Sequence, residues 1–515
     1  MATVRTGEKP GLLMRVLNGI EAAGNRLPDP VTIFVVGIIL LVALSVVFEG
    51  MGLKATHPGT GKEIAAVSLL SPAIIQKFFV EMAQTFTAFP PLGLVLVTLL
   101  GVGVAERSGL IAVSLGAFVR AMPPALLTPA VVFAGVQSSL AADAGYVVLT
   151  PLAAALFASV GRHPLAGLAA AYAGVSGGFS ANLLITGLDP LLAGITQSAA
   201  QLIDPNYTVA ITANYFLMIA LVPVITIAGW WVSATIVEPR LNTMLPDWTR
   251  TPEPAQDAAQ QRRESRGLWA AGVVLLALVA LFVWLTVPEG APFRAADGSV
   301  EPFLRGLVGI LAVSFFLTGF AYGVVAGTIR SDKDVVRMMG DTMGSMGMYI
   351  VLAFFVAQFL ALFSWSNLGA IMAINGAQGL QAAGFTGLPL LLAMVLMTMG
   401  INLMVGSASA KWAILAPIFV PMLMLVGITP EATQAAYRIG DSATNPISPL
   451  LPYFPLVLVM AQRYIPNFGI GSFIATLLPY SVVFAITTSA LFALWFALDL
   501  PFFFGTGTTM PVAGG

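Results

Sequence analysis

The chain has 515 residues, and only 9% of them are Asp, Glu, Lys or Arg, compared with about a quarter in ordinary soluble domains. Apolar residues make up 58% of the chain and the mean hydropathy is +0.91, which excludes a soluble protein and predicts one embedded in a lipid bilayer. A formal net charge of -1 gives no basic excess for nucleic acid, and two histidines without any cysteine provide no zinc-type cluster.

The N-terminal segment, residues 1–30, is polar, and no signal-peptide cleavage site follows the first apolar stretch, so we expect that stretch to be retained. Nine stretches are apolar over the length that a helix needs to cross a hydrocarbon core of about 30 Å. They are 31–50, 89–105, 164–188, 211–237, 267–287, 304–329, 344–364, 438–461 and 473–498. We therefore predict an all-α polytopic membrane protein with nine transmembrane helices.

Two further apolar segments, 123–160 and 389–426, each have small and polar residues at their centre, which predicts two re-entrant hairpins. Placing Arg120 and Arg162, at the ends of the first hairpin, in the cytoplasm also places most other lysines and arginines there. This layout predicts a multi-pass inner-membrane protein whose N-terminus is cytoplasmic and whose C-terminus is outside.

The same layout divides the chain into five parts. These are a cytoplasmic N-terminal segment 1–30, a first membrane half 31–237, a cytoplasmic linker 238–266, a second membrane half 267–500 and a C-terminal tail 501–515. The stretch from Arg107 to Met122 is short and only partly apolar, and we expect it to lie along the membrane interface.

The two halves contain an internal repeat. SLAADAGYVVLTPL (139–152) aligns with VGSASAKWAILAPI (405–418), so the two hairpin tips are related. About thirty residues later, GVSGGFSANLLITGLD (174–189) and GDSATNPISPLLP (440–452) each interrupt an apolar span with polar, helix-breaking residues. Because the first hairpin opens inside and the second outside, the repeat is inverted, which is typical of secondary transporters. Chance similarity among small residues of membrane helices is the alternative.

Five charged residues fall at membrane depth: Asp143, Asp189, Lys411, Arg438 and Asp441. A charge at the bilayer centre costs upward of about 2.5 kcal/mol, so each needs a partner or a watery cavity. Arg438 and Asp441 are three residues apart and could pair with each other on one helix, and contact with a substrate is the equal alternative. Asp189 could instead lie at the outer membrane surface, because it ends its predicted span.

Polar oxygens accompany both predicted breaks, where freed carbonyls and hydroxyls can bind a cation. They are contributed by Ser180, Asn182, Thr186, Ser442, Thr444, Asn445 and Ser448. Hydrogen bonding between helices is the alternative role for these residues. Trp412, beside Ser409 at the second tip, could stack on an aromatic substrate or be an ordinary packing residue. No phosphate-binding loop or HExxH motif occurs, which disfavours an ATP-driven pump or a metal-dependent intramembrane enzyme.

At four stretches the sequence resembles the p-aminobenzoyl-glutamate transporter (AbgT) family, part of a wider ion-transporter superfamily. These stretches are QSSLAADAGYVVLTPLAAALF (137–157), GVSGGFSANLLITGLDPLL (174–192), INLMVGSASAKWAILAPIFVPM (401–422) and YRIGDSATNPISPLLPYFP (437–455). The resemblance implies a homodimer of nine-helix subunits that takes up p-aminobenzoyl-glutamate or exports sulfonamide antimetabolites. It also implies functional roles for Asp189, Ser409, Trp412, Pro430, Arg438, Asp441 and Pro449.

We therefore predict an ion-coupled secondary transporter, and not an enzyme, for p-aminobenzoyl-glutamate or related p-aminobenzoate and sulfonamide compounds. Arg438 would bind a carboxylate, Trp412 would stack on the aromatic ring, and Asn182 and Asn445 would line the site. Asp189 would carry the coupling proton or act as a gate, since a carboxyl group in apolar surroundings binds a proton more readily than in water. Asp143 is the alternative proton carrier, or it could cap a half-helix inside the first hairpin.

Sodium is the alternative coupling ion, held by the oxygens of Ser180, Asn182, Ser442, Thr444 and Asn445. A sodium-coupled dicarboxylate symporter is the alternative function, with Lys411 as a second carboxylate-binding cation. We expect no cofactor apart from the coupling ion.

Overall fold

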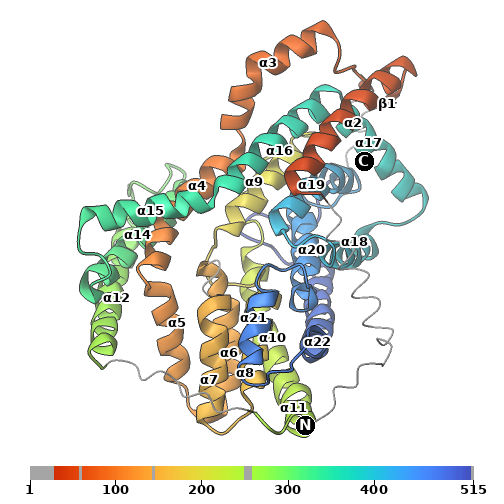
Figure 1. The fold of residues 1–515 in the computed structure, drawn as a ribbon. Coiled ribbons are helices and arrows are strands. Elements are labelled where there is room, and N and C mark those ends of the chain that lie inside the picture. Colours follow the sequence, from red (N-terminus) through yellow and green to blue (C-terminus); the bar gives the residue numbers. More distant parts are fainter. Residues whose placement is uncertain (1–27, 57–60, 142–144, 249–257, 512–515) are drawn as a thin grey trace.

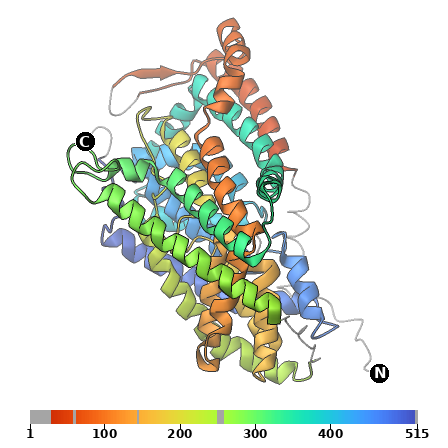
Figure 2. The same ribbon diagram turned by 90° about the vertical axis from the view of Figure 1, so that its left-hand side faces the viewer.

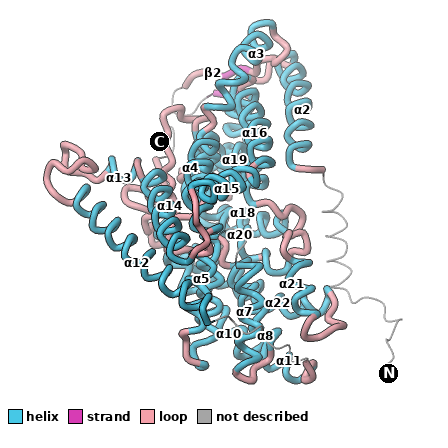
Figure 3. Tube along the Cα trace, turned by 60° about the vertical axis from the view of Figure 1, so that its left-hand side comes forward, coloured by secondary structure: helices cyan, strands magenta, loops and turns pink. Residues whose placement is uncertain are grey.

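The computed structural model describes residues 28–56, 61–141, 145–248 and 258–511. Most of the predicted segment 1–30, part of the linker 238–266, the last residues of the tail and Asp143 lie outside these ranges. The described chain is built almost entirely of helices, as Figure 3 shows. Its one sheet consists of β1 (Lys54–Thr56) and β2 (Glu63–Ala65), paired antiparallel. The predicted all-α membrane fold is confirmed.

One group of helices is widely exposed, and all of them except the charged helix α15 (Asp332–Ser345) are largely apolar. It comprises α2 (Pro30–Gly50), α3 (Pro72–Thr87), α4 (Pro90–Arg107), α12 (Ala258–Thr286), α14 (Leu307–Ala326), α15 and α16 (Gly347–Trp365). The helices α12, α14 and α4 pack side by side, and α16 packs against α2 and α3 (Figure 1). Figure 2 shows α12 as the long green helix that crosses one side of the molecule. Exposed apolar faces of this kind suit contact with lipid.

A second group surrounds the buried core. It comprises α6 (Leu127–Gln137), α7 (Thr150–Ser159), α8 (Pro164–Gly177), α9 (Leu188–Ala200), α10 (Tyr215–Val232), α18 (Gly387–Asn402), α19 (Ala408–Leu425), α20 (Pro430–Ala443), α21 (Phe454–Gln462) and α22 (Ile470–Ala497). The shorter helices α5 (Leu110–Arg120), α11 (Glu238–Met244), α13 (Glu301–Arg305) and α17 (Leu368–Ala382) complete the chain, with short 3-10 and π segments between them. Every residue of α8 and of α20 is buried. These two helices therefore form the centre of the molecule.

The predicted breaks follow α8 and α20. Helix α8 ends at Gly177 and α9 begins at Leu188, while α20 ends at Ala443 and α21 begins at Phe454. The predicted bounds of both spans were too short, because α9 continues to Ala200 and α20 already begins at Pro430. Each broken span therefore has a well-formed helix on both sides of an irregular stretch.

Within the described residues, eight helices are long and apolar enough to cross a membrane, or nine if the bent pair α17–α18 counts as one span. Seven of the nine predicted spans correspond to these helices. The other two are the broken ones, whose halves are too short to qualify individually. Helix α19, an arm of the second hairpin, qualifies in their place.

Two features of these helices were not predicted. Helix α17 was not predicted, although it packs against α19, and α3 extends α4 into one stretch of 36 residues. Helix α5 runs beside α6 in Figure 1 and contacts both segments of the first hairpin tip.

The two outer ends of the first hairpin lie on the same side of the molecule as the start of the linker. Arg162, just after α7, forms a 2.5 Å ion pair with Glu238 of α11. The same guanidinium donates a hydrogen bond to Thr128 near the start of α6, at 2.7 Å. The first hairpin therefore enters and leaves on one side, as a re-entrant segment must.

Candidate functional site

Each hairpin tip lies against the break that follows it in the repeat. At the first tip, the Asn182 amide donates to Ser139 Oγ at 2.8 Å, and Leu183 N donates to Gln137 Oε1 at 3.1 Å. At the second, Asn402 Nδ2 lies 2.8 Å from Asn445 Oδ1. The features that repeat in the sequence therefore meet in space, as they do in transporters with inverted repeats.

Two buried ion pairs occupy this region. Arg438 Nη1 of α20 lies 2.6 Å from Asp189 Oδ1 of α9, and Lys411 Nζ of α19 lies 2.5 Å from Asp441 Oδ1 of α20. All four side chains are at most 4% exposed. The alternative in which Arg438 pairs with Asp441 is wrong, because each has a partner on another helix. The first pair joins the two halves of the repeat across their breaks.

Asp189 is the second residue of α9 and is 1% exposed. It is therefore enclosed by protein and not exposed at the surface of the molecule. Its Oδ2 accepts hydrogen bonds from the main-chain N–H of Thr186 at 2.6 Å and from the Thr186 hydroxyl at 3.0 Å. The positive end of the α9 dipole favours a carboxylate here as well. The break thus fixes one carboxylate oxygen and leaves the other to face Arg438.

Two of the three donor nitrogens of Arg438 have no hydrogen-bond partner among the described residues. Its contact with Asp189 uses Nη1, whereas Nε and Nη2 are buried and have no hydrogen-bond partner in the described part of the chain. Buried guanidinium donors without partners are uncommon in folded proteins, because leaving them unsatisfied costs free energy. A planar guanidinium binds a carboxylate with two parallel hydrogen bonds. The free edge of Arg438 therefore suits an anionic ligand.

Lys411 lies among oxygens contributed by the second tip and the second break. Its ammonium contacts Asn402 Oδ1 as well as Asp441. The Asn402 amide in turn lies 2.7 Å from Asp441 O and 2.9 Å from Thr444 Oγ1. The ammonium thus supplies the positive charge of this oxygen cluster. Because it is engaged there, Lys411 presents no free cation of the kind that a dicarboxylate symporter would use.

Of the other proposed ion ligands, Asn182 and Asn445 take part in local hydrogen bonds. Asn182 Oδ1 accepts from Leu184 N at 3.0 Å, and Asn445 Nδ2 donates to Ser176 O at 3.1 Å. Ser180 is buried in the first break, and Ser442 Oγ has no partner among the described residues. No cluster of three or more His, Asp or Glu side chains that could hold a metal occurs in the ranges that the structure describes.

Trp412 is completely buried one turn into α19. Its ring stacks on Tyr437 of α20, with centroids 4.5 Å apart, and its Nε1 donates to Thr196 Oγ1 of α9 at 2.9 Å. This position is compatible with a packing role for Trp412 and also with contact to a substrate, because Tyr437 adjoins both Arg438 and Asp441. The hydroxyl of Tyr437 donates to Ala408 O at 2.5 Å.

Three residues implied by the family resemblance lie farther from the ion pairs. Ser409 is half-buried at the start of α19, where its hydroxyl is 3.2 Å from that of Ser407. Pro430 is the first residue of α20, about 12 Å along the helix from Arg438 at 1.5 Å per residue. Pro449 lies in the second break. Pro430 suits a first helical position, because it has no N–H to satisfy.

Sequence reasoning missed Asn402, Thr196, Tyr437 and a buried carboxylate at Glu431. Asn402 is the single amide in an otherwise apolar hairpin arm, and that isolation was a usable signal. Glu431 was missed because the predicted span began seven residues after it. No sequence signal placed Thr196 against Trp412.

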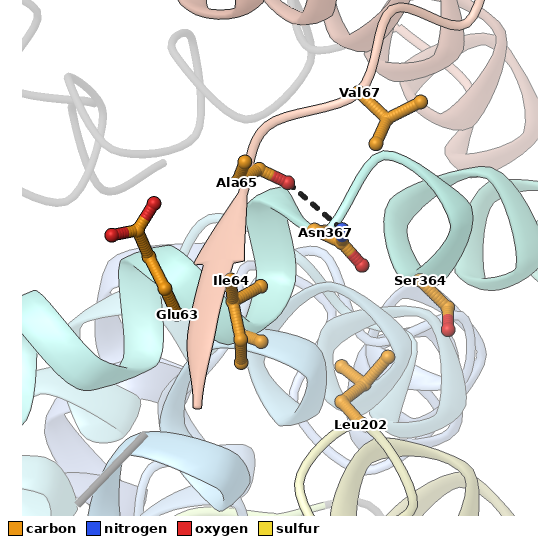
Figure 4. Close-up of a pocket in the computed structure, with 8 residues that line it drawn as sticks. Glu63, Ile64, Ala65, Val67, Leu202, Ser364 and Asn367 are labelled. Atoms are coloured by element: carbon orange, nitrogen blue, oxygen red, sulfur yellow. Dashed lines mark hydrogen bonds between the residues drawn. The ribbon is translucent and has the colours of Figure 1, made fainter. Parts of the chain in front are cut away.

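A crevice of about 400 Å³ lies at a different place, near the sheet (Figure 4). Its lining includes Glu63 and Ile64 of β2 and, from the turn between α16 and α17, Asn367, whose amide donates to Ala65 O at 2.8 Å. It contains none of the four ion-pair residues. The buried charges, and not this crevice, define the candidate site.

Two hairpins, two broken helices and charges buried where they meet define a membrane transporter. The AbgT putative transporter family matches residues 15–510. The chain belongs to this family, whose members are transporters and not enzymes.

The chain is 34% identical over 505 residues to the p-aminobenzoyl-glutamate transport protein of Escherichia coli strain K12, covering 97% of this chain and 98% of that protein. It is similar to the crystal structure of the Alcanivorax borkumensis YdaH transporter, with a TM-score of 0.89, 46% identity and coverage of 92% and 100%. It is also similar to Neisseria gonorrhoeae MtrF, described as illuminating a class of antimetabolite efflux pumps, with a TM-score of 0.87, 44% identity and coverage of 96% and 100%.

Proposed function

We propose that this protein is an ion-coupled secondary transporter of p-aminobenzoyl-glutamate or of related p-aminobenzoate and sulfonamide compounds. The observation that carries the proposal is the buried guanidinium of Arg438, with two donors that no described residue satisfies. The relative from Escherichia coli supports the first substrate, and the resemblance to MtrF supports the second.

The chemistry of p-aminobenzoyl-glutamate fits these residues. Its glutamate part carries carboxylates, and one of them can accept two hydrogen bonds from Arg438. Its aromatic ring can take a place beside Trp412 and Tyr437, whose rings already stack. Asn182 and Asn445, one at each break, would complete the lining with amide donors and acceptors.

Substrate entry requires the helices to part. Arg438 is 3% exposed, Asp189 1% and Trp412 0%, so a molecule of this size cannot reach them while the tips and breaks remain packed together. Alternating access supplies that movement, because the breaks allow one half-helix to move relative to the other.

The coupling ion in this proposal is a proton. A substrate carboxylate on the free edge of Arg438 competes with Asp189 for the guanidinium, and Asp189 carries the coupling proton. Asp189 thereby gates the site. The Lys411 ammonium already supplies a cation to the oxygens of the second break, which favours a proton over sodium. Assembly as a homodimer, with the N-terminus in the cytoplasm and the C-terminus outside, belongs to the same proposal.

Reconstitution into vesicles tests this function. Movement of labelled p-aminobenzoyl-glutamate and of a labelled sulfonamide would be followed under an imposed pH gradient and, separately, an imposed sodium gradient. We expect transport to follow the pH gradient. Transport that follows only sodium would contradict proton coupling, and transport of neither compound would contradict the substrate class.

A further inference from the structure

Glu431 is the buried acid that the ion pairs do not account for. Among the described residues, three acidic side chains are buried: Asp189, Glu431 and Asp441. Asp189 and Asp441 each face a cation, whereas Glu431, at 2% exposure, has no ion-pair partner in the part of the chain that the structure describes. An isolated buried carboxylate costs several kcal/mol. Binding a proton removes that cost.

The groups around Glu431 do not neutralise its charge. Its Oε2 accepts a hydrogen bond from the Tyr207 hydroxyl at 2.9 Å. Helices α9 and α19 both pack against α20. Asp189 of α9 and Lys411 of α19 each form an ion pair with a residue of α20 other than Glu431. Helices α8 and α22 contribute Tyr172 and Tyr480, which are neutral phenols, and α18 has no charged residue.

A route for protons leads from Glu431 to the surface. Tyr207 is half-buried in the loop between α9 and α10, and its neighbours Asp204, Asn206 and Thr208 are exposed. Burial and the Glu431 carboxylate raise the pKa of Tyr207, so its hydroxyl remains a donor at ordinary pH. One hydrogen bond therefore separates the buried carboxylate from a solvent-exposed loop.

A second set of hydrogen bonds links Glu431 to the candidate substrate site. The Asn214 amide donates to the main-chain carbonyl of Glu431 at 2.8 Å and accepts from Gln434 Nε2 at 2.8 Å. Thr196 Oγ1 lies 2.6 Å from Gln434 Oε1 and accepts from Trp412 Nε1 at 2.9 Å. A shift of the first turn of α20 thus changes the contacts that position Trp412.

We propose that Glu431 is a second proton-binding site of the transport cycle, separate from the Asp189–Arg438 pair and connected to Trp412 through Asn214, Gln434 and Thr196. The carboxylate gains one proton from water through the loop at Tyr207 and releases it when the first turn of α20 moves. The inference rests on the proposed proton-coupled function, and it adds a second proton to each turnover.

The number of protons moved per substrate tests the inference. In vesicles, the pH gradient that just balances a fixed gradient of p-aminobenzoyl-glutamate gives this ratio. We expect Glu431→Gln to lower the ratio by about one proton per substrate, while substrate exchange at equal pH stays within about twofold of the wild type. Glu289→Gln, an exposed glutamate in the loop after α12, is the matched control and should leave the ratio unchanged.

The outcomes separate the two proposals. A wild-type ratio of zero contradicts the proposed proton coupling itself. A non-zero ratio that Glu431→Gln leaves unchanged overturns only the role of Glu431. If Glu431→Gln does not fold, Tyr207→Phe decides, because loss of the donor destabilises the carboxylate and should shift the pH profile of transport upward. An unshifted profile would then overturn the inference.

Discussion

The pairing of the buried charges makes a specific prediction about stability. Arg438→Met and Asp189→Asn each leave a buried charge without its partner, which should cost about 3–5 kcal/mol of unfolding free energy. Asparagine keeps an acceptor for the two donors of Thr186, so the change at Asp189 isolates the lost charge. The double variant removes both charges together and should be more stable than the sum of the single effects predicts.

The size of this loss in unfolding free energy follows from the burial of the Arg438–Asp189 pair. The Arg438 and Asp189 side chains are 4% and 0% exposed and their atoms approach to 2.6 Å, so solvent does not screen the pair as it does surface pairs, which contribute only about 0–1 kcal/mol. We expect a coupling energy of at least about 2 kcal/mol in the double-mutant cycle. Denaturant unfolding in detergent micelles, followed by tryptophan fluorescence, measures the four free energies.

A second cycle provides the control. Asp441 faces Lys411, so Arg438→Met combined with Asp441→Asn should show weaker coupling than Arg438→Met with Asp189→Asn. Coupling that is strongest between Arg438 and Asp441 would refute the pairing and restore the alternative in which neighbours on one helix bind each other.

Arg438→Lys keeps the charge but loses the planar guanidinium. Equilibrium binding of p-aminobenzoyl-glutamate should therefore weaken about tenfold, while binding of an uncharged sulfonamide is nearly unaffected. Equal losses for the two compounds would exclude a carboxylate contact. Gly440→Ala places a Cβ 2.6 Å from a main-chain carbonyl of α18 and should cost about 1–3 kcal/mol, whereas Gly272→Ala, with no atom within 4 Å, should be neutral in the same unfolding assay. Hydrogen bonds from Thr508 hold the pKa of Asp499 below its usual 3.8, so this contact is present at neutral pH and lost as the pH falls through that lowered pKa. Amide exchange at Thr508 should accordingly rise in strong acid, and at neutral pH in Asp499→Asn; a rate independent of both would disprove the link.

The architecture was largely predictable because lipid imposes a strong pattern on sequence. Long apolar stretches predicted most helices, and polar breaks at 174–189 and 440–452 predicted where two of them are interrupted. The start of α20 was not predictable in this way. Its first turns carry Glu431 and Gln434, which lower the hydropathy of a helix that is nevertheless fully buried. Protein surrounds that helix, so lipid does not select its composition.

The residues of the site were easier to predict than their contacts. A charge at membrane depth stands out in a sequence, which is why Asp189, Lys411, Arg438 and Asp441 were identified. Which of them pair depends on how separate helices pack, and local spacing favoured the wrong partner for Arg438. Neutral partners such as Thr196 carry no signal of this kind.

The end of the chain returns to the centre of the fold. Phe502 O accepts from Phe216 N at 3.0 Å, Thr508 O accepts from Thr429 N at 3.2 Å, and Met510 N donates to Gly427 O at 2.9 Å. Residues 502–510 thus secure Thr429, the residue that caps α20. Synthesis proceeds from the N-terminus, so the helix that carries Glu431 and Arg438 gains these contacts only after residues 502–510 have been made. A premature stop near residue 500 would leave the membrane spans of the described residues complete, but it would remove the hydrogen bonds that hold the start of α20 in place.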